Sequence, residues 1–200
     1  MNEFMHKFFK KSFVIIFIFL YIMCLSCQKS EDFKGIKTPE NTITKNIKLI
    51  DHNGKQFTLS DYKGKVVLVF FGFTHCPDVC PMTLHTFKKI KQELKTEGKV
   101  KFVYITVDPN RDTNERLKES LENFGSDFIG LTGSKEVLDS TYAAYGVFSE
   151  KIEMPESALG YTISHTSRIF VIDRNGNWRL LIPYDSPLED ILHDIRLLLN

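Results

Sequence analysis

The segment Phe70–Pro81 limits most strongly what this chain can fold into, because it places two cysteines between two kinds of secondary structure. Cys76 and Cys80 follow the apolar run Val66–Phe71, which has the composition of a strand buried on both faces. A helical pattern begins directly after them. Open α/β sheets place their functional groups where a strand leads into a helix in this way. The segment therefore predicts an α/β fold with its site at this junction.

The spacing of the two cysteines favours a functional role for both. Cysteines four residues apart near the first turn of a helix point the same way. The partial positive charge and unpaired N–H groups of a helix N-terminus favour thiolate over thiol. Two such sulfurs can cycle between dithiol and disulfide, or bind a soft metal ion. A structural disulfide is less favoured, because a bridge that closes so short a loop adds little stability.

The N-terminus has the pattern of an export signal. Three lysines between Lys7 and Lys11 precede the apolar run Phe13–Leu25. This run is short for a membrane span, which needs roughly 20 apolar residues. The ending Ser26-Cys27 is similar to a bacterial lipobox, in which the cysteine is lipidated and becomes the new N-terminus. We therefore predict that residues 1–27 are a lipoprotein signal peptide; an uncleaved signal anchor and conventional cleavage are the alternatives.

These expectations define the mature protein. Residues 28–41 are polar and read as a flexible tether, so residues 42–200 should form the folded domain. We expect an exported monomer, lipid-anchored to the cytoplasmic membrane and facing the periplasm or the cell exterior. Such a compartment permits disulfides, and the domain retains only Cys76 and Cys80. The net charge of +1 gives no electrostatic basis for binding nucleic acid.

Strand and helix patterns alternate along the domain. Asn53-Gly54 suits a type I′ turn and predicts an N-terminal β-hairpin. Alternating strands and helices with a closing hairpin indicate an α/β fold with a central mixed sheet flanked by helices. A cysteine pair at a strand–helix junction suggests a thioredoxin-like fold, although the spacing is C-x-x-x-C. The expected strands are Ile43–Ile50, Gln56–Leu59, Lys65–Phe71, Val100–Val107, Arg168–Asp173 and Trp178–Ile182, and the expected helices are Met82–Lys95, Asp112–Phe124, Ser134–Tyr145 and Ser186–Leu199.

Several segments together resemble the Sco/SenC family of copper proteins. Members of this family are thioredoxin-fold chaperones that help to assemble the CuA centre of cytochrome c oxidase. The similarity covers roughly Ile47 to the C-terminus, and the cysteine motif is its most specific part. The matching segments are Asp61–Gly72, Thr74–Pro81, Val107–Pro109 with Arg111–Thr113, Phe128–Gly133 and Tyr161–Ser167.

The resemblance implies a copper site made by Cys76, Cys80 and His165. The residues alone do not single out His165, because a lone histidine in a loop is more often an ordinary surface residue. The other histidines that compete for the role are His52, His75, His85 and His193. The chain departs from the family at one neighbouring position, since Ser164 stands where the family usually has an aspartate.

The chemistry of this donor set agrees with copper. Soft thiolates select Cu(I), and an added imidazole lets Cu(II) bind too. A structural zinc site needs four protein ligands, and the chain offers three. Asp78 lies between the cysteines and could tune their acidity or dock a partner. The plainer reading is that Cys-Pro-Asp makes a tight turn.

Two functions remain open at this point. The first is a copper chaperone that delivers Cu(I) or Cu(II) to the CuA site of cytochrome c oxidase subunit II. The second is an enzyme, a thiol–disulfide oxidoreductase that uses Cys76 and Cys80 as redox-active groups on exported proteins. A peroxidase-like thiol enzyme is a minor third alternative. His165 discriminates between the first two, because metal binding needs it and dithiol exchange does not.

Overall fold

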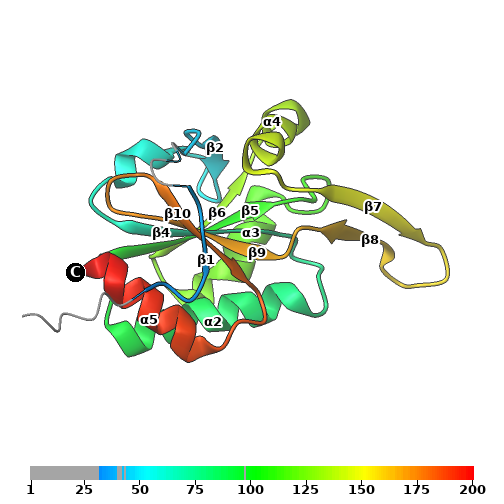
Figure 1. The fold of residues 1–200 in the computed structure, drawn as a ribbon. Helices are drawn as coiled ribbons and strands as arrows, with labels where there is room; N and C mark the ends of the chain where they lie inside the picture. Colours follow the sequence, from blue (N-terminus) through cyan, green and yellow to red (C-terminus); the bar gives the residue numbers. More distant parts are fainter. Residues whose placement is uncertain (1–31, 40–41, 43, 97) are drawn as a thin grey trace, which may run out of the picture. The chain divides into compact units, whose positions relative to one another are not determined.

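The computed structural model describes residues 32–39, 42, 44–96 and 98–200 of the chain. The predicted signal peptide, with Cys27, lies outside these residues. Residues 33–200 form one compact unit, drawn in Figure 1. Among the described residues, no helix is long and apolar enough to cross a membrane.

A mixed eight-stranded sheet organises this unit, with strand order β1-β10-β9-β4-β5-β6-β2-β3. Strands β4, β5 and β6 run parallel to one another, and the other pairings are antiparallel. The mixed sheet confirms the predicted fold class, and the β2–β3 pair is the predicted N-terminal hairpin. The strands are β1 Ile36–Lys37, β2 Lys48–Asp51, β3 Gln56–Thr58, β4 Val66–Gly72, β5 Val100–Thr106, β6 Phe128–Thr132, β9 Arg168–Ile172 and β10 Trp178–Pro183.

The centre of the sheet is the hydrophobic core. Every residue of β4 is buried, as expected for a strand covered on both faces. Its register with β5 pairs Phe70 with Tyr104 and Gly72 with Thr106. The carboxyl ends of these two strands therefore meet at one edge, where the cysteine loop begins.

Helices cover both faces of the sheet. In Figure 1, α2 and α5 lie side by side on one face and α4 lies on the other. The predicted helix Ser134–Tyr145 is α4, in which the Ser134 side chain accepts a hydrogen bond from the Val137 N–H and Gly146 ends the helix at φ 64°. The helices are α2 Val79–Leu94, α3 Asn114–Leu121, α4 Lys135–Tyr145 and α5 Leu188–Leu199, with short 3-10 helices at Leu59–Tyr62 and Glu122–Phe124.

One further hairpin was not predicted. Strands β7 (Ser149–Met154) and β8 (Gly160–His165) pair with each other in a separate two-stranded sheet. In Figure 1 this hairpin extends away from the main sheet. Most of its side chains are exposed, so its sequence lacks the buried alternation that marks a strand.

The start of the domain also differs from the prediction, because the last part of the expected tether is attached to the domain. Strand β1 pairs with β10, and the backbone N–H groups of Lys34 and Gly35 each donate to the buried Asp194 carboxylate at 2.8 Å. A polar segment of this kind carries no apolar period, so its attachment through backbone groups was not visible in the sequence.

Candidate functional site

The two cysteines lie where β4 leads into α2, at the junction that the sequence indicated. Cys80 lies in the first turn of α2 and is only 2% exposed, whereas Cys76 precedes the helix and is half-buried. Both are free thiols, and they are hydrogen-bonded to each other. This junction therefore presents one accessible sulfur, that of Cys76, and one enclosed sulfur, that of Cys80.

This arrangement separates the acidities of the two thiols. A hydrogen bond from Cys80, together with backbone N–H groups at the start of α2, lowers the pKa of Cys76 to about 6. The same hydrogen bond, together with the burial of the Cys80 side chain, raises the pKa of Cys80 well above the ordinary value for a thiol. Cys76 is thus the thiolate of the pair at neutral pH, and Cys80 retains its proton. The helix N-terminus acts as predicted on Cys76 only.

Tyr104 is a site residue that the sequence did not reveal. Its hydroxyl on β5 is a hydrogen-bond partner of Cys80 and partly offsets the rise in the pKa of that thiol. Gly72 makes the approach possible, because a Cβ there would lie 2.7 Å from the Tyr104 hydroxyl and 3.0 Å from the Cys80 Sγ. A tyrosine inside an apolar run gives no sign in the sequence that its hydroxyl faces a thiol.

His165 ends strand β8, and the fold brings it to the cysteines. Its Nε2 lies 3.9 Å from the Sγ of Cys80. Its Nδ1 lies 3.1 Å from the Thr166 carbonyl oxygen, which places the ring proton on Nδ1 and leaves the Nε2 lone pair facing the sulfur. Burial lowers the pKa of His165, which keeps the imidazole neutral. The ring also packs edge-on against Phe70 and Phe73.

Two competing histidines near the motif face other groups. His75 is directed toward Thr74 and Asp112, with its Nδ1 3.1 Å from the Thr74 Oγ1. His85 is exposed on α2, and its Nδ1 lies 2.9 Å from the Pro81 carbonyl oxygen. Both rings thus contact groups other than the two thiols.

The two remaining histidines lie on other elements. His193 is half-buried on α5. His52 follows β2, and its Nδ1 accepts a hydrogen bond from the Gly130 N–H at 2.9 Å. His52 thus ties the β2–β3 turn to β6.

Asp78 sits at the N-cap of α2 with its side chain exposed, and this side chain makes no capping hydrogen bond. Its backbone N–H, in contrast, is a hydrogen-bond donor to Cys76 and contributes to the lowered pKa of that thiol. Asp78 therefore acts on the site through its backbone N–H, which helps to stabilise the Cys76 thiolate. A role of its carboxylate toward a partner stays a prediction.

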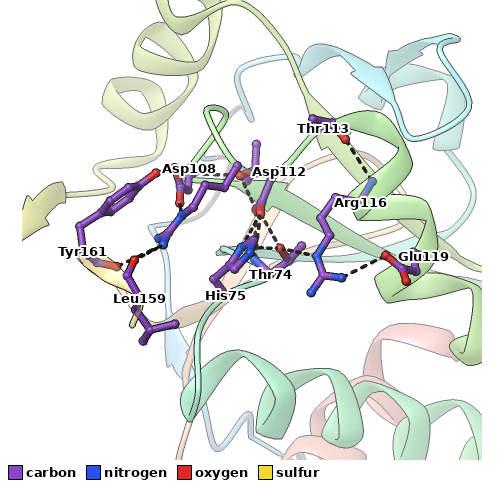
Figure 2. Close-up of polar contacts among 11 residues, drawn as sticks. Thr74, His75, Asp108, Asp112, Thr113, Arg116, Glu119, Leu159 and Tyr161 are labelled. Carbon is purple, nitrogen blue, oxygen red and sulfur yellow. Dashed lines mark hydrogen bonds and ion pairs between the residues drawn. The ribbon is translucent and has the colours of Figure 1, made fainter. Parts of the chain in front are cut away.

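A buried carboxylate fixes the loop that leads into Cys76. Figure 2 shows Asp112 next to Thr74, where it accepts hydrogen bonds from the Thr74 N–H and, at 2.6 Å, from the Thr74 hydroxyl. It also accepts a hydrogen bond from Thr106 at 2.7 Å. Burial raises the pKa of Asp112, and these hydrogen bonds oppose the rise. Asp112 therefore ties the end of β4 to the end of β5 beside the thiols.

An apolar cavity of about 220 Å³ adjoins the two sulfurs. It lies between α2 and α3, and only a few polar atoms reach it. The walls that exclude water here also weaken the hydration of a charged sulfur, which is one cause of the high pKa of Cys80. The lining residues, besides the cysteines, are Phe73, Thr74, Pro81, Leu84, Tyr104, Leu117, Ser120, Leu121 and Phe124.

The donor set fits a soft metal ion, but it is not a closed cage as it stands. Within the described ranges, no group of three or more histidine, cysteine or acidic side chains is close enough together to hold a metal ion. The fold nevertheless pairs Cys80 with Cys76 on one side and with His165 on the other. Cys80 is therefore the residue that the two other candidate ligands share as a neighbour.

Comparison with known proteins identifies relatives over most of the chain. The sequence profile of the SCO1/SenC family matches residues 36–200. A SCO2-like protein of Rickettsia felis is 36% identical over 149 residues, which cover 74% of this chain and 73% of the relative. A Stutzerimonas stutzeri protein with a copper-binding name is 34% identical over 143 residues, covering 70% of this chain and 69% of that protein.

Solved structures show the same fold. ScoI of Bradyrhizobium japonicum, solved with copper bound, is 33% identical with a TM-score of 0.70 and covers 78% of this chain and 99% of its own. A SCO1/SenC family lipoprotein of Bacillus anthracis is 29% identical with a TM-score of 0.69 and coverages of 82% and 99%. BsSco, described as having a disulfide switch and as a member of the Sco family of cytochrome c oxidase assembly proteins, is 25% identical with a TM-score of 0.61 and coverages of 81% and 96%.

Proposed function

Because the chain belongs to the SCO1/SenC family, we propose that it is a copper-binding chaperone whose cargo is held by Cys76, Cys80 and His165. The observation that carries this proposal is the orientation of His165. Its Nδ1 is occupied by a backbone carbonyl, and its Nε2 faces Cys80 at 3.9 Å. The imidazole nitrogen that carries a lone pair is thus directed at a sulfur, as a metal ligand of this set would need to be.

Copper is the metal that best suits these donors. Two sulfurs and one imidazole nitrogen match the preference of Cu(I) for soft ligands and still permit Cu(II). The low pKa of Cys76 supplies one thiolate without cost at neutral pH, whereas Cys80 must release its proton on binding. The copper-bound ScoI structure and the copper-binding name of the Stutzerimonas relative support the same metal.

The proposed client is the CuA site of cytochrome c oxidase subunit II. Support comes from BsSco, which is described as a cytochrome c oxidase assembly protein. An exported, lipid-anchored location would place the site beside such a membrane-bound client, and the Bacillus anthracis relative is described as a lipoprotein. Ser164, where the family usually has an acid, is exposed on β8, and neighbouring strand residues point to opposite faces. Its side chain would thus meet a partner rather than the metal.

A second function is favoured by the unequal thiols. Cys76, as thiolate, can attack a client disulfide and form a mixed disulfide, with one client cysteine leaving as a thiolate. Cys80 then loses its proton and attacks Cys76, which releases the second client thiol. The client gains two electrons, and the protein is left with a Cys76–Cys80 disulfide. This reductase activity needs both cysteines and does not need His165.

Copper binding by single variants tests the proposal. Cys76→Ser and Cys80→Ser should each abolish tight binding, because each removes one of only two sulfurs. His165→Ala should weaken Cu(II) binding most, since Cu(I) can remain on two thiolates. Titration with competing chelators measures both affinities. Equal Cu(II) affinity of His165→Ala and the parent protein would remove His165 from the site, and dithiol exchange would then be the better account.

A further inference from the structure

The loop between β5 and α3 holds the β7–β8 hairpin through Arg111. The Arg111 side chain is mostly buried, and its Nε donates to the Asp108 carboxylate at 2.5 Å. Its Nη1 lies 3.2 Å from each of two carbonyl oxygens, those of Leu159 and Tyr161. One guanidinium therefore joins a carboxylate on the loop to the backbone at the start of β8.

Tyr161 completes this connection from the hairpin side. The Arg111 guanidinium lies over the Tyr161 ring with 3.6 Å between its Cζ and the ring centroid, and the Tyr161 hydroxyl donates to Asp108 at 2.9 Å. Lys151 of β7 lies 4.2 Å from the centroid of the same ring. Asp108 and Tyr161 are labelled in Figure 2, with the Leu159 carbonyl beside them. These contacts fix the hairpin at its β8 strand.

The fixed strand is the one that ends in His165. The hairpin is paired with itself and has no ladder to the main sheet, so its placement depends on contacts such as these. Arg111 also lies 5.9 Å from the ring of Phe73, and this ring packs edge-on against the His165 imidazole at 5.8 Å. Arg111 is thus connected to His165 in two ways: through its hydrogen bonds to the backbone at the start of β8, and through the Phe73 ring that contacts both residues.

We propose that Arg111 is a positioning residue for His165, which holds the hairpin so that the imidazole Nε2 faces Cys80. The inference rests on the proposed function, since it assigns Arg111 a part in forming the imidazole side of the copper site. The sulfur side is positioned separately, because Asp112 holds the loop before Cys76 through Thr74. A single short loop therefore sets both halves of the site through two different residues.

The experiment compares Arg111→Gln and Arg111→Lys in the full chain. Glutamine removes the charge, the fork and the stacking surface, whereas lysine keeps the charge but not the planar fork. Arg174→Gln is the matched control, because Arg174 also donates to a backbone carbonyl, that of Leu199, but is exposed and away from the site. His165→Ala is the reference for complete loss of the imidazole.

Two measurements probe the site, with urea unfolding as a control, and the second applies only to the variants that retain His165. The first is the affinity for Cu(II) and for Cu(I) by chelator competition. The second uses the metal-free protein and follows the rate at which diethyl pyrocarbonate modifies His165, read by peptide mass spectrometry. The second measurement reports the exposure of the imidazole without any copper, and urea unfolding shows whether each variant remains folded.

We expect Arg111→Gln to lower Cu(II) affinity about 10- to 100-fold, the range found when the group that orients a metal-binding histidine is removed. Cu(I) affinity should stay unchanged, and His165 should be modified faster. Arg111→Lys should recover only part of the Cu(II) affinity, and Arg174→Gln should match the parent protein.

Three results would overturn the inference. Unchanged Cu(II) affinity and His165 modification in Arg111→Gln, with loss in His165→Ala, would refute the role of Arg111 and leave the proposed function standing. An equal fall in Cu(I) and Cu(II) affinity with a lower unfolding midpoint would make Arg111 a purely structural residue. A parent protein whose Cu(II) affinity does not depend on His165 would refute the proposed function and, with it, the copper role of Arg111.

Discussion

The Nε2 of His165 lies 3.9 Å from the Sγ of Cys80, although 85 residues separate them in the chain. The cysteine lies in the first turn of α2, which packs on the main sheet, and the histidine ends a strand of a separate hairpin. The site therefore lies between α2, which is part of the main domain layer, and β8, whose hairpin is not paired with the main sheet. Its sulfur half and its imidazole half should therefore respond to different substitutions.

The rate at which Cys76 is alkylated should depend on pH with a midpoint well below that of an ordinary thiol. The pKa of Cys76 is lowered to about 6, so the thiolate is present above pH 6 and is lost as the pH falls through that value. The rate of reaction with iodoacetamide should therefore reach half its maximum near pH 6 and level off above pH 7. Cys80→Ala removes the hydrogen bond that contributes most to this shift and should move the midpoint upward. A midpoint near 8.5, the ordinary thiol value, in the parent protein would contradict the prediction.

Mild oxidation should form a reversible Cys76–Cys80 disulfide that blocks copper uptake. The two thiols are already hydrogen-bonded to each other, and oxidation consumes both sulfur ligands. The number of free thiols among Cys76 and Cys80 should fall from two to none with oxidant and return to two with dithiothreitol, and copper binding should follow the same course. Copper uptake by protein with no free thiols would show that the sulfurs are not the ligands.

Asp112→Asn should destabilise the fold around the site. The buried carboxylate accepts hydrogen bonds from the Thr74 N–H and from two hydroxyls. The NH₂ group of an asparagine cannot accept a hydrogen bond, so at least one of these donors would lose its acceptor. The expected loss is about 1–3 kcal/mol in the free energy of unfolding, the cost of leaving a buried polar group unpaired. Urea denaturation measures it. Asp139→Asn, which breaks an exposed i,i+4 pair with Lys135, should change stability by less than about 0.5 kcal/mol; equal effects of both would be evidence against the role of Asp112.

Much of the fold could be predicted because its signals are local. The apolar run of β4 reads as a strand from its composition alone, and Ser134 and Gly146 mark the ends of α4 through the backbone groups that they cap. The cysteine pair located one half of the site for the same reason, since the strand, loop and helix N-terminus are contiguous in sequence. Even there, the helix began at Val79, earlier than expected, so Cys80 lies inside the first turn.

The remainder depends on contacts between distant segments. The β7–β8 hairpin is exposed and shows no buried period, and Tyr104 meets Cys80 only because β5 lies beside β4 in one particular register. The unequal pKa values of the two thiols likewise come from burial and from their mutual hydrogen bond. His165 was named through the resemblance to a family, whereas the orientation of its ring could be known only from the fold.

Lipidation at Cys27 remains a prediction, because this residue lies outside the described part of the chain. A basic segment, a short apolar run and Ser26-Cys27 motivate it. Mass spectrometry of the mature N-terminus should find a diacylglyceryl cysteine, whose two acyl chains suffice for stable membrane attachment. Cys27→Ser should leave copper binding intact and abolish this modification. An unmodified Cys27 or an intact Met1 would mean that the protein is anchored by the apolar run or cut elsewhere.

X-ray absorption at the copper edge of the loaded protein tests the central claim most directly, because it identifies the atoms bound to the metal. With one Cu(II) per chain, the spectrum should fit two sulfur ligands and at least one imidazole nitrogen, and the imidazole signal should vanish in His165→Ala. A first shell made only of nitrogen and oxygen, or an imidazole signal that persists in His165→Ala, would contradict a site formed by Cys76, Cys80 and His165.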